Sequence, residues 1–166
     1  EGACGGMYTA NTMASVAGRL LHRKGQTLAT AESCTGGLLG SLITAVAGSS
    51  EYYLGGAVSY ANAAKQTLLG VDSELLERHG AVSEPVAAAM AEGCRRRLAA
   101  DWAIAITGIA GPGGGSEEKP VGLVYTALAG PAGTTVTRHL FPGNREHIRE
   151  RAAMAALNEL RLAMGG

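Results

Sequence analysis

Short apolar runs alternate with helix-period segments along almost all of this 166-residue chain, and this alternation restricts the fold more than any other feature. The predicted strands cover residues 27–31, 54–60, 102–106, 120–129 and 134–141. Parallel strands need crossover helices, which cover both faces of a sheet, so the pattern predicts a three-layer α/β/α sandwich. The segment 130–133, Gly-Pro-Ala-Gly, joins the last two strands as a hairpin and makes the mostly parallel sheet mixed.

The predicted helices begin and end at recognisable cap residues. They cover residues 8–24, about 35–46, 62–70, 72–79, 83–100 and 145–163. Asn62 and Ser83 are placed as N-caps, and Gly25, Gly70 and Gly80 follow helix ends. The sequence shows no interdomain linker, so residues 7–166 are expected to form one domain. Residues 1–6 lack periodicity and are interpreted as a cloning remnant or a disordered tail.

Composition excludes some classes of function. Fourteen basic and fourteen acidic side chains give zero formal charge, so no broad basic field favours nucleic acid as the main partner. No apolar stretch approaches the roughly 20 residues that span a bilayer, so no membrane partner is expected. Three cysteines, an odd number, suit a reducing compartment. We expect a cytoplasmic protein that forms a homo-oligomer.

The segment Ala29-Thr-Ala-Glu-Ser-Cys-Thr-Gly-Gly37 joins a predicted strand to a predicted helix. Such a turn places Ser33 at the carboxyl edge of the sheet, where α/β folds bind ligands. Free backbone N–H groups at the helix start could stabilise an oxyanion. The alternative is that Ser33 or Thr35 merely caps the helix.

Lys65 is the second candidate for chemistry. If Asn62 is the N-cap, Lys65 falls at the third helical position, where the helix dipole disfavours a positive charge. Partial burial there would lower its pKa and provide a neutral base. A solvated helix lysine is the alternative. Tyr60, at a strand end, is near enough in sequence to share the site, although a structural tyrosine is equally consistent with the pattern.

A glycine-rich segment, Thr107 to Gly115, follows the strand at 102–106. Its five glycines in nine residues can form an anion-binding nest of N–H groups, or simply a flexible connection. Arg145 opens the last helix and could hold a phosphate, although a surface arginine is the commoner outcome. No histidine, aspartate or cysteine spacing indicates a metal ligand set or a Ser-His-Asp triad, and Cys34 has no predicted histidine partner.

Six blocks taken in order are more specific than any one of them. They are Ala31-Glu-Ser-Cys-Thr-Gly-Gly37, Ala47-Gly-Ser-Ser50, Ser59-Tyr-Ala-Asn-Ala-Ala-Lys65, His79-Gly-Ala-Val-Ser-Glu-Pro85, Thr107-Gly-Ile-Ala-Gly-Pro112 and Gly114-Gly-Ser-Glu-Glu-Lys-Pro-Val-Gly122. Together they resemble the CinA C-terminal domain family, whose stand-alone members are nicotinamide-nucleotide amidases.

The resemblance implies an amidohydrolase that converts nicotinamide mononucleotide to nicotinate mononucleotide and ammonia, without cofactor or metal. It implies serine–lysine chemistry by Ser33, Lys65 and Tyr60, and leaves open whether Ser33 or Ser50 attacks. The residues expected to line the substrate pocket are Ser50, Thr35, Thr107, Gly108, Gly111 and Arg145. The alternative function is a catalytically silent nucleotide-binding module that works with a partner in competence or DNA repair.

Overall fold

The computed structural model describes the backbone of residues 4–166 and the side chains from residue 13 onward. Its helices are α1 (Cys4–Lys24), α2 (Leu38–Thr44), α3 (Asn62–Leu69), α4 (Ser73–His79), α5 (Glu84–Leu98) and α6 (Arg145–Ala163), with the short 3-10 helix η1 (Ser49–Glu51). Its strands are β1 (Leu28–Glu32), β2 (Tyr53–Val58), β3 (Trp102–Gly108), β4 (Leu123–Gly130) and β5 (Gly133–Leu140).

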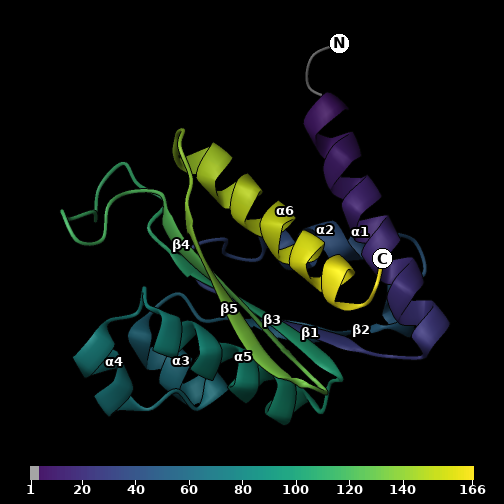
Figure 1. Ribbon diagram of the computed structural model, residues 1–166, viewed down its shortest axis with the longest axis horizontal. Helices are drawn as coiled ribbons and strands as arrows, with labels where there is room; N and C mark the ends of the chain where they lie inside the picture. The colour runs from purple at the N-terminus through teal and green to yellow at the C-terminus, as the bar shows by residue number, and fades with distance from the viewer. Residues whose placement is uncertain (1–3) are drawn as a thin grey trace.

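The five strands form one mixed sheet in the order β2-β1-β3-β4-β5. β1 pairs in parallel with β2 and β3, whereas β4 is antiparallel to both β3 and β5. The predicted hairpin is confirmed, since Gly130 pairs with Gly133. Three helices (α1, α2 and α6) cover one face, and α3, α4 and α5 cover the other (Figure 1). The predicted three-layer α/β/α class is therefore correct.

The period-2 pattern of β3 explains the two different cores. Ile104 and Ile106 face α1, α2 and α6, whereas Ala103 and Ala105 face α5. Alanines from neighbouring strands continue the second face, so α5 packs close to the sheet with small side chains between. The large apolar residues of β3 thus lie on one side of the sheet and its alanines on the other.

Two helix starts differ from the predictions. Residues 33–37 form a turn with Gly36 and Gly37 at positive φ, so α2 begins at Leu38 rather than near Thr35. The N-cap of α3 is Ala61, and Asn62 is its first helical residue. The junction before α2 thus takes more turn residues than predicted, whereas α3 begins one residue earlier than predicted.

At the amino end, α1 begins at Cys4, and residues 1–3 lie outside the described residues. The interpretation of residues 1–6 as a cloning remnant or a disordered tail stays a prediction. No helix in the described part of the chain is long and apolar enough to cross a membrane.

Candidate active site

Ser33 stands directly after β1, at the carboxyl edge of the sheet. Its N–H continues the β1–β3 ladder by donating to the Ile106 carbonyl at 2.9 Å, so the backbone at this position is fixed by the sheet. The side chain is buried, with 8% of its surface exposed. The chain then reverses through the two positive-φ glycines, which a residue with a Cβ would adopt only under strain.

Lys65 reaches Ser33 from the first turns of α3. Its Nζ lies 3.0 Å from Ser33 Oγ, 2.8 Å from the Ser59 carbonyl oxygen and 3.1 Å from the Tyr60 carbonyl oxygen. The side chain is 1% exposed, and no carboxylate of the described residues forms an ion pair with it. The amine is thus enclosed by two carbonyls and one hydroxyl.

This surrounding favours the neutral amine. Burial lowers the pKa of Lys65 below its ordinary value of 10.5, opposed only by the nearby Cys34 sulfur. A neutral amine has two N–H donors for the two carbonyls and one lone pair, which can accept the Ser33 hydroxyl proton. The sequence predicted a lowered pKa from the helix dipole together with partial burial, and burial is the main cause.

Tyr60 contributes to the site mainly through its backbone. Its carbonyl accepts from Lys65, but its phenol is 60% exposed and points to Arg145, whose Nη2 donates to Tyr60 Oη at 3.2 Å. Arg145 also donates from Nη1 to the Gly111 carbonyl at 2.7 Å. The first residue of α6 thereby links Tyr60 to the glycine-rich segment at the rim of the site.

The end of β3 lies beside Ser33, because Ile106 pairs with Glu32. Thr107 is buried there, and its hydroxyl donates to the Ala81 carbonyl at 2.9 Å, so it holds the loop that precedes α5. Gly108 is the last residue of β3, and a Cβ on it would come 2.6 Å from Val124. Both predicted residues lie at the correct edge of the sheet, but the Thr107 hydroxyl is already bonded.

The turn after Ser33 contains unused polar groups. The Thr35 hydroxyl is fully buried and has no hydrogen-bond partner among the described residues. Within the same described part of the chain, the N–H groups of Cys34, Thr35 and Gly37 have none either. The N–H groups at the start of α2, which we expected to be free, are instead bonded to the Thr35 carbonyl and to the Glu32 carboxylate.

Sequence reasoning missed Glu32 and Arg149. The buried Glu32 carboxylate accepts from the N–H groups of Leu39 at 2.8 Å and Gly40 at 3.0 Å, and so fixes the start of α2. Arg149 of α6 donates to the carbonyls of Cys34 and Thr35. A buried-type strand that ends in glutamate just before a helix was a usable signal for Glu32. Arg149 carried no comparable signal.

Ser50 does not belong to this site. It lies exposed in η1, just before β2, and the first residue of β2 pairs with the first residue of β1. Ser50 is therefore at the amino edge of the sheet, whereas Ser33 is at the carboxyl edge. This corrects the prediction that Ser50 lines the pocket or acts as the alternative nucleophile.

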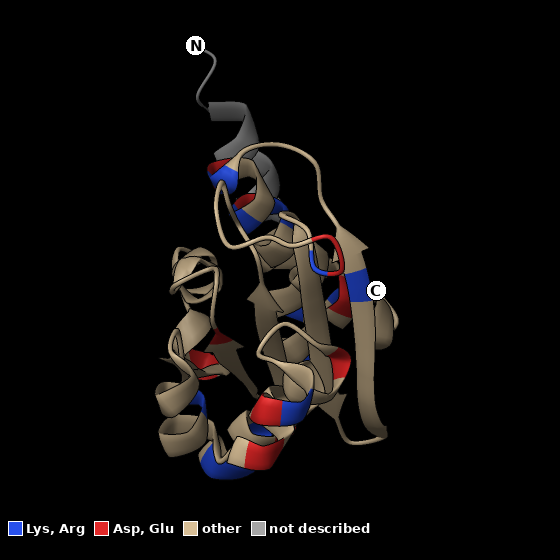
Figure 2. Cartoon of the chain, turned by 90° about the vertical axis from the view of Figure 1, so that its left-hand side faces the viewer, with Lys and Arg blue, Asp and Glu red and all other residues tan. Residues whose placement is uncertain are grey.

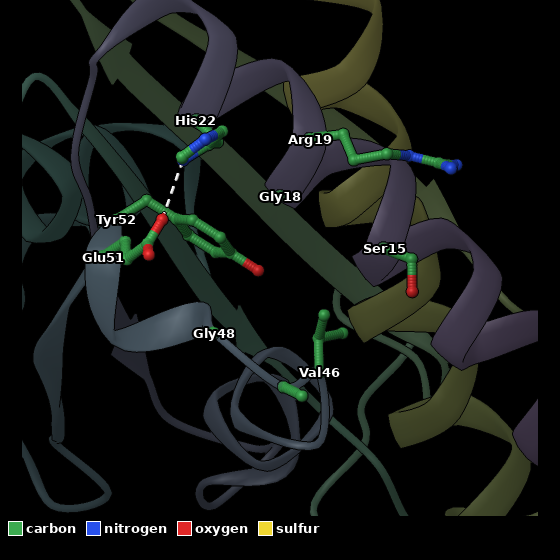
Figure 3. Close-up of a pocket in the computed structure, with 9 residues that line it drawn as sticks. Ser15, Gly18, Arg19, His22, Val46, Gly48, Glu51 and Tyr52 are labelled. Carbon is green, nitrogen blue, oxygen red and sulfur yellow. Dashed lines mark ion pairs between the residues drawn. The ribbon is translucent and has the colours of Figure 1, made fainter.

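Two hollows lie elsewhere on the surface. One, of about 450 Å³, lies between α1 and the segment around η1, where Tyr52 points inward and His22 pairs with Glu51 at 2.8 Å (Figure 3). The other, of about 560 Å³, lies beside the end of α5 and the β4–β5 turn. Neither is lined by Ser33 or Lys65.

Other reactive groups fit less well as the centre of a reaction. Burial raises the pKa of the Cys34 thiol to about 11, so this cysteine is protonated at neutral pH. Among the described residues, no three His, Cys, Asp or Glu side chains gather as a metal ligand set. Figure 2 shows that basic and acidic residues lie next to one another on the same helices, as the zero formal charge of the chain led us to expect.

Comparisons with known proteins agree with the fold and with the family that the six sequence blocks resemble. A sequence model of the CinA C-terminal domain matches residues 10–164. A CinA-like protein of Parasynechococcus marenigrum is 56% identical over 155 residues, which are 92% of this chain and 37% of that protein. A CinA-like protein of Anaeromyxobacter is 58% identical over 87% of this chain and 35% of its own length. The chain thus spans little more than a third of these curated relatives.

Solved structures are similar over their whole length. The competence/damage inducible protein CihA of Agrobacterium tumefaciens superposes with a TM-score of 0.91 at 41% identity, over 95% of this chain and 96% of that one. A CinA superfamily protein of Klebsiella pneumoniae gives 0.91 at 35% identity, over 94% and 98%.

Proposed function

The chain belongs to the CinA C-terminal domain family, and we propose that it is an amidohydrolase that converts nicotinamide mononucleotide to nicotinate mononucleotide and ammonia. The observation that carries the proposal is the buried Lys65 amine, 3.0 Å from Ser33 Oγ, with its other two neighbours both acceptors. A serine next to a neutral amine in a water-poor setting is an activated nucleophile.

The proposed reaction has two halves, and Lys65 carries the proton in each. Lys65 Nζ accepts the hydroxyl proton as Ser33 Oγ attacks the carboxamide carbon, which gives a tetrahedral oxyanion. The resulting ammonium returns the proton to the amide nitrogen, the C–N bond breaks, and ammonia leaves an ester on Ser33. Water then attacks the ester while Lys65 takes its proton, and Ser33 is released with nicotinate.

The surroundings of the dyad support an anionic substrate. Three helices (α3, α5 and α6) begin at or next to the carboxyl edge of the sheet, so their positive ends lie on the same side as Ser33. Arg145 and the glycine-rich segment add a cation and backbone N–H groups at the rim. Under this proposal they hold the nucleotide phosphate, and the pyridine ring lies toward Ser33.

The cellular setting is part of the proposal. Free Cys34 and Cys94, both buried, are consistent with a reducing cytoplasm. The edge strand β2 carries Leu54 and Val58 exposed, and such an apolar edge favours a homo-oligomer. The proposed reaction requires no cofactor.

The test is ammonia release from nicotinamide mononucleotide by the purified chain, with Ser33→Ala and Ser50→Ala compared side by side. Ser33→Ala should lower kcat by about a thousandfold or more. Ser50→Ala, at the other edge of the sheet, should remain within about twofold of the unmodified chain. The reverse order would transfer the nucleophile to Ser50. An unmodified chain that binds the nucleotide but releases no ammonia would instead support a silent nucleotide-binding module.

A further inference from the structure

Arg149 connects the last helix to the turn that follows Ser33. Its Nε donates to the Cys34 carbonyl at 3.0 Å and its Nη2 to the Thr35 carbonyl at 2.8 Å, across more than a hundred residues of sequence. Nε and Nη2 form one edge of the planar guanidinium, so both carbonyls point toward the same group. Arg149 forms no ion pair with the described residues, and its charge is directed at this turn.

Because the peptide group is planar, the contact with Arg149 also fixes the directions of N–H groups in the turn. In a trans peptide, the carbonyl of one residue and the N–H of the next point in opposite directions. Because Arg149 holds the carbonyls of Cys34 and Thr35, the N–H groups of Thr35 and Gly36 must point away from it. The Gly36 N–H donates to the Ser33 carbonyl at 3.1 Å, which shows that this opposite side is the Ser33 side.

The Thr35 N–H therefore points away from Arg149 and has no partner among the described residues. The N–H of Cys34, the residue after Ser33, also has no partner among the described residues, but its peptide includes the Ser33 carbonyl, which Arg149 does not contact. Donors that are fixed before the reaction stabilise a developing oxyanion without reorganisation. A turn with two glycines at positive φ would otherwise have freedom to rotate these peptides.

We propose that Arg149 is a positioning residue, which holds the Cys34–Thr35 peptide so that the Thr35 N–H serves as an oxyanion donor for attack by Ser33. This inference rests on the proposed amidohydrolase function. Arg149 itself touches neither the substrate nor Ser33 Oγ; it acts through the backbone of the turn. A Cβ on residue 36 would lie 3.6 Å from Arg149 Nη2, an ordinary contact, so the turn needs glycine there for its positive φ and not to admit Arg149.

The experiment compares Arg149→Met and Arg149→Lys with the control Arg151→Met. Arg151 is on the same helix, is exposed, and donates to the Pro142 carbonyl away from the turn. Arg149→Met should lower kcat for nicotinamide mononucleotide about 30- to 100-fold, somewhat less than the loss of a whole oxyanion donor. KM should stay within about threefold, because the substrate contacts remain.

Two further readouts separate positioning from a merely structural role. The pH at which activity rises should not move, because Lys65 is untouched. Arg149→Lys should stay as slow as Arg149→Met within about threefold, because an ammonium cannot hold two carbonyls in a fork. Full activity in Arg149→Met, or a raised KM at unchanged kcat, would overturn the proposal. Recovery of activity in Arg149→Lys would also overturn the proposal, because a positive charge alone would then be sufficient. If Arg149→Met does not fold, Arg149→Lys carries the test.

A fluorophosphonate probe separates this inference from the substrate assignment. The probe phosphonylates Ser33 directly: Oγ attacks the phosphorus, fluoride leaves, and Lys65 takes the hydroxyl proton. The phosphoryl oxygen occupies the oxyanion hole, and mass spectrometry detects the modified peptide. Slow labelling of Arg149→Met beside fast labelling of the unmodified chain supports the inference even if nicotinamide mononucleotide proves not to be the substrate. Equal labelling of the two overturns it. An unmodified chain that neither labels nor releases ammonia overturns both proposals.

Discussion

At the residue scale, the central feature is an amine that is buried among oxygen acceptors without an anion. Lys65 has two carbonyls and the Ser33 hydroxyl as neighbours, and its pKa is lowered because the charged form loses hydration. A lysine paired with a carboxylate would stay protonated and could not act as a base. The absence of such a partner among the described residues therefore matters as much as the distance to Ser33.

The first prediction concerns the pH dependence of activity. If neutral Lys65 is the base, kcat/KM should rise with pH through an inflection below 10.5, since the lowered pKa is that of the free site. Lys65→Arg should be inactive across this range, because a guanidinium stays protonated. Initial rates of ammonia release against pH provide the measurement. An active Lys65→Arg chain would mean that the residue supplies only charge.

The pH dependence of the free energy of unfolding tests the lowered pKa of Lys65 without a substrate. Between the lowered pKa of Lys65 and 10.5, the unfolded chain binds more protons than the folded one, so the free energy of unfolding rises with pH across that window. Lys65→Met lacks this contribution. The difference between the unmodified chain and Lys65→Met should be flat at low pH and then grow in favour of lysine. Urea unfolding at a series of pH values measures it, and a difference that stays flat up to pH 10.5 contradicts the lowered pKa.

The second prediction concerns the Thr35 hydroxyl, which is buried without a partner. An unpaired buried hydroxyl costs roughly 1–3 kcal/mol, so Thr35→Val should leave the stability unchanged or raise it by up to about 1 kcal/mol. If the hydroxyl meets the substrate, KM should rise about fivefold or more. The control is Thr30→Val, which removes a 2.6 Å contact with Tyr53 Oη and should destabilise the chain. A Thr35→Val chain that loses stability would show that the hydroxyl has a partner after all.

At the element scale, close helix packing places Lys65. Helix α3 carries the lysine, and α3 rests on α5, which in turn lies on the alanine face of the sheet. The contact depends on Gly93, where an added Cβ would come 1.9 Å from the backbone oxygen of Leu69. The absence of a side chain at one position of α5 thus sets the height of α3 above the sheet.

The third prediction is that Gly93→Ala destabilises the chain by about 2–3 kcal/mol through overpacking. On helix propensity alone, the substitution would stabilise by about 1 kcal/mol, so the sign of the effect decides between the two. Activity should also fall, because α3 must move and Lys65 moves with it. Gly113→Ala, which has open space around its Cβ, should stay within about 0.5 kcal/mol. Thermal and urea unfolding provide the comparison, and a stabilised Gly93→Ala would contradict the close contact.

At the scale of the whole molecule, the site is assembled at one edge of the sheet from segments distant in sequence. Arg145 contacts both Tyr60 and Gly111, and so closes the rim between α6, the end of β2 and the glycine-rich segment. Lys119, in the loop between that segment and β4, donates to the His79 carbonyl at 2.6 Å and ties this loop to the end of α4. The rim therefore depends on the complete fold rather than on one motif.

The fourth prediction tests whether this rim recognises a phosphate. Arg145→Ala should weaken binding of the nucleotide about ten- to a hundredfold, the value of a lost charge-assisted contact, and leave the nucleoside nearly unchanged. Tyr60→Phe is the matched variant, because it removes the contact to Arg145 and keeps the guanidinium. Calorimetric titration with both ligands provides the measurement. Equal losses for nucleotide and nucleoside would mean that Arg145 supports the rim and does not contact the phosphate.

The sequence by itself determined the layers and most of the elements. Helix α6 covers the predicted residues 145–163, and the hairpin lies at the predicted Gly130 to Gly133 turn. These features depend on neighbours within a few residues, which a single sequence displays directly. The pairing of Ser33 with Lys65 was expected from the six blocks together, since spacing alone left a helix cap and a solvated lysine open.

Only the tertiary structure decided which groups share the site. It excluded Ser50, turned the Tyr60 phenol toward Arg145, and brought Arg149 to the Cys34 and Thr35 carbonyls. It also moved the start of α2 to Leu38, because the Glu32 carboxylate occupies the N–H groups there. Each of these outcomes depends on where a distant segment lies when the sheet closes. Local periodicity carries no information on that position, because it is set by packing across the two cores.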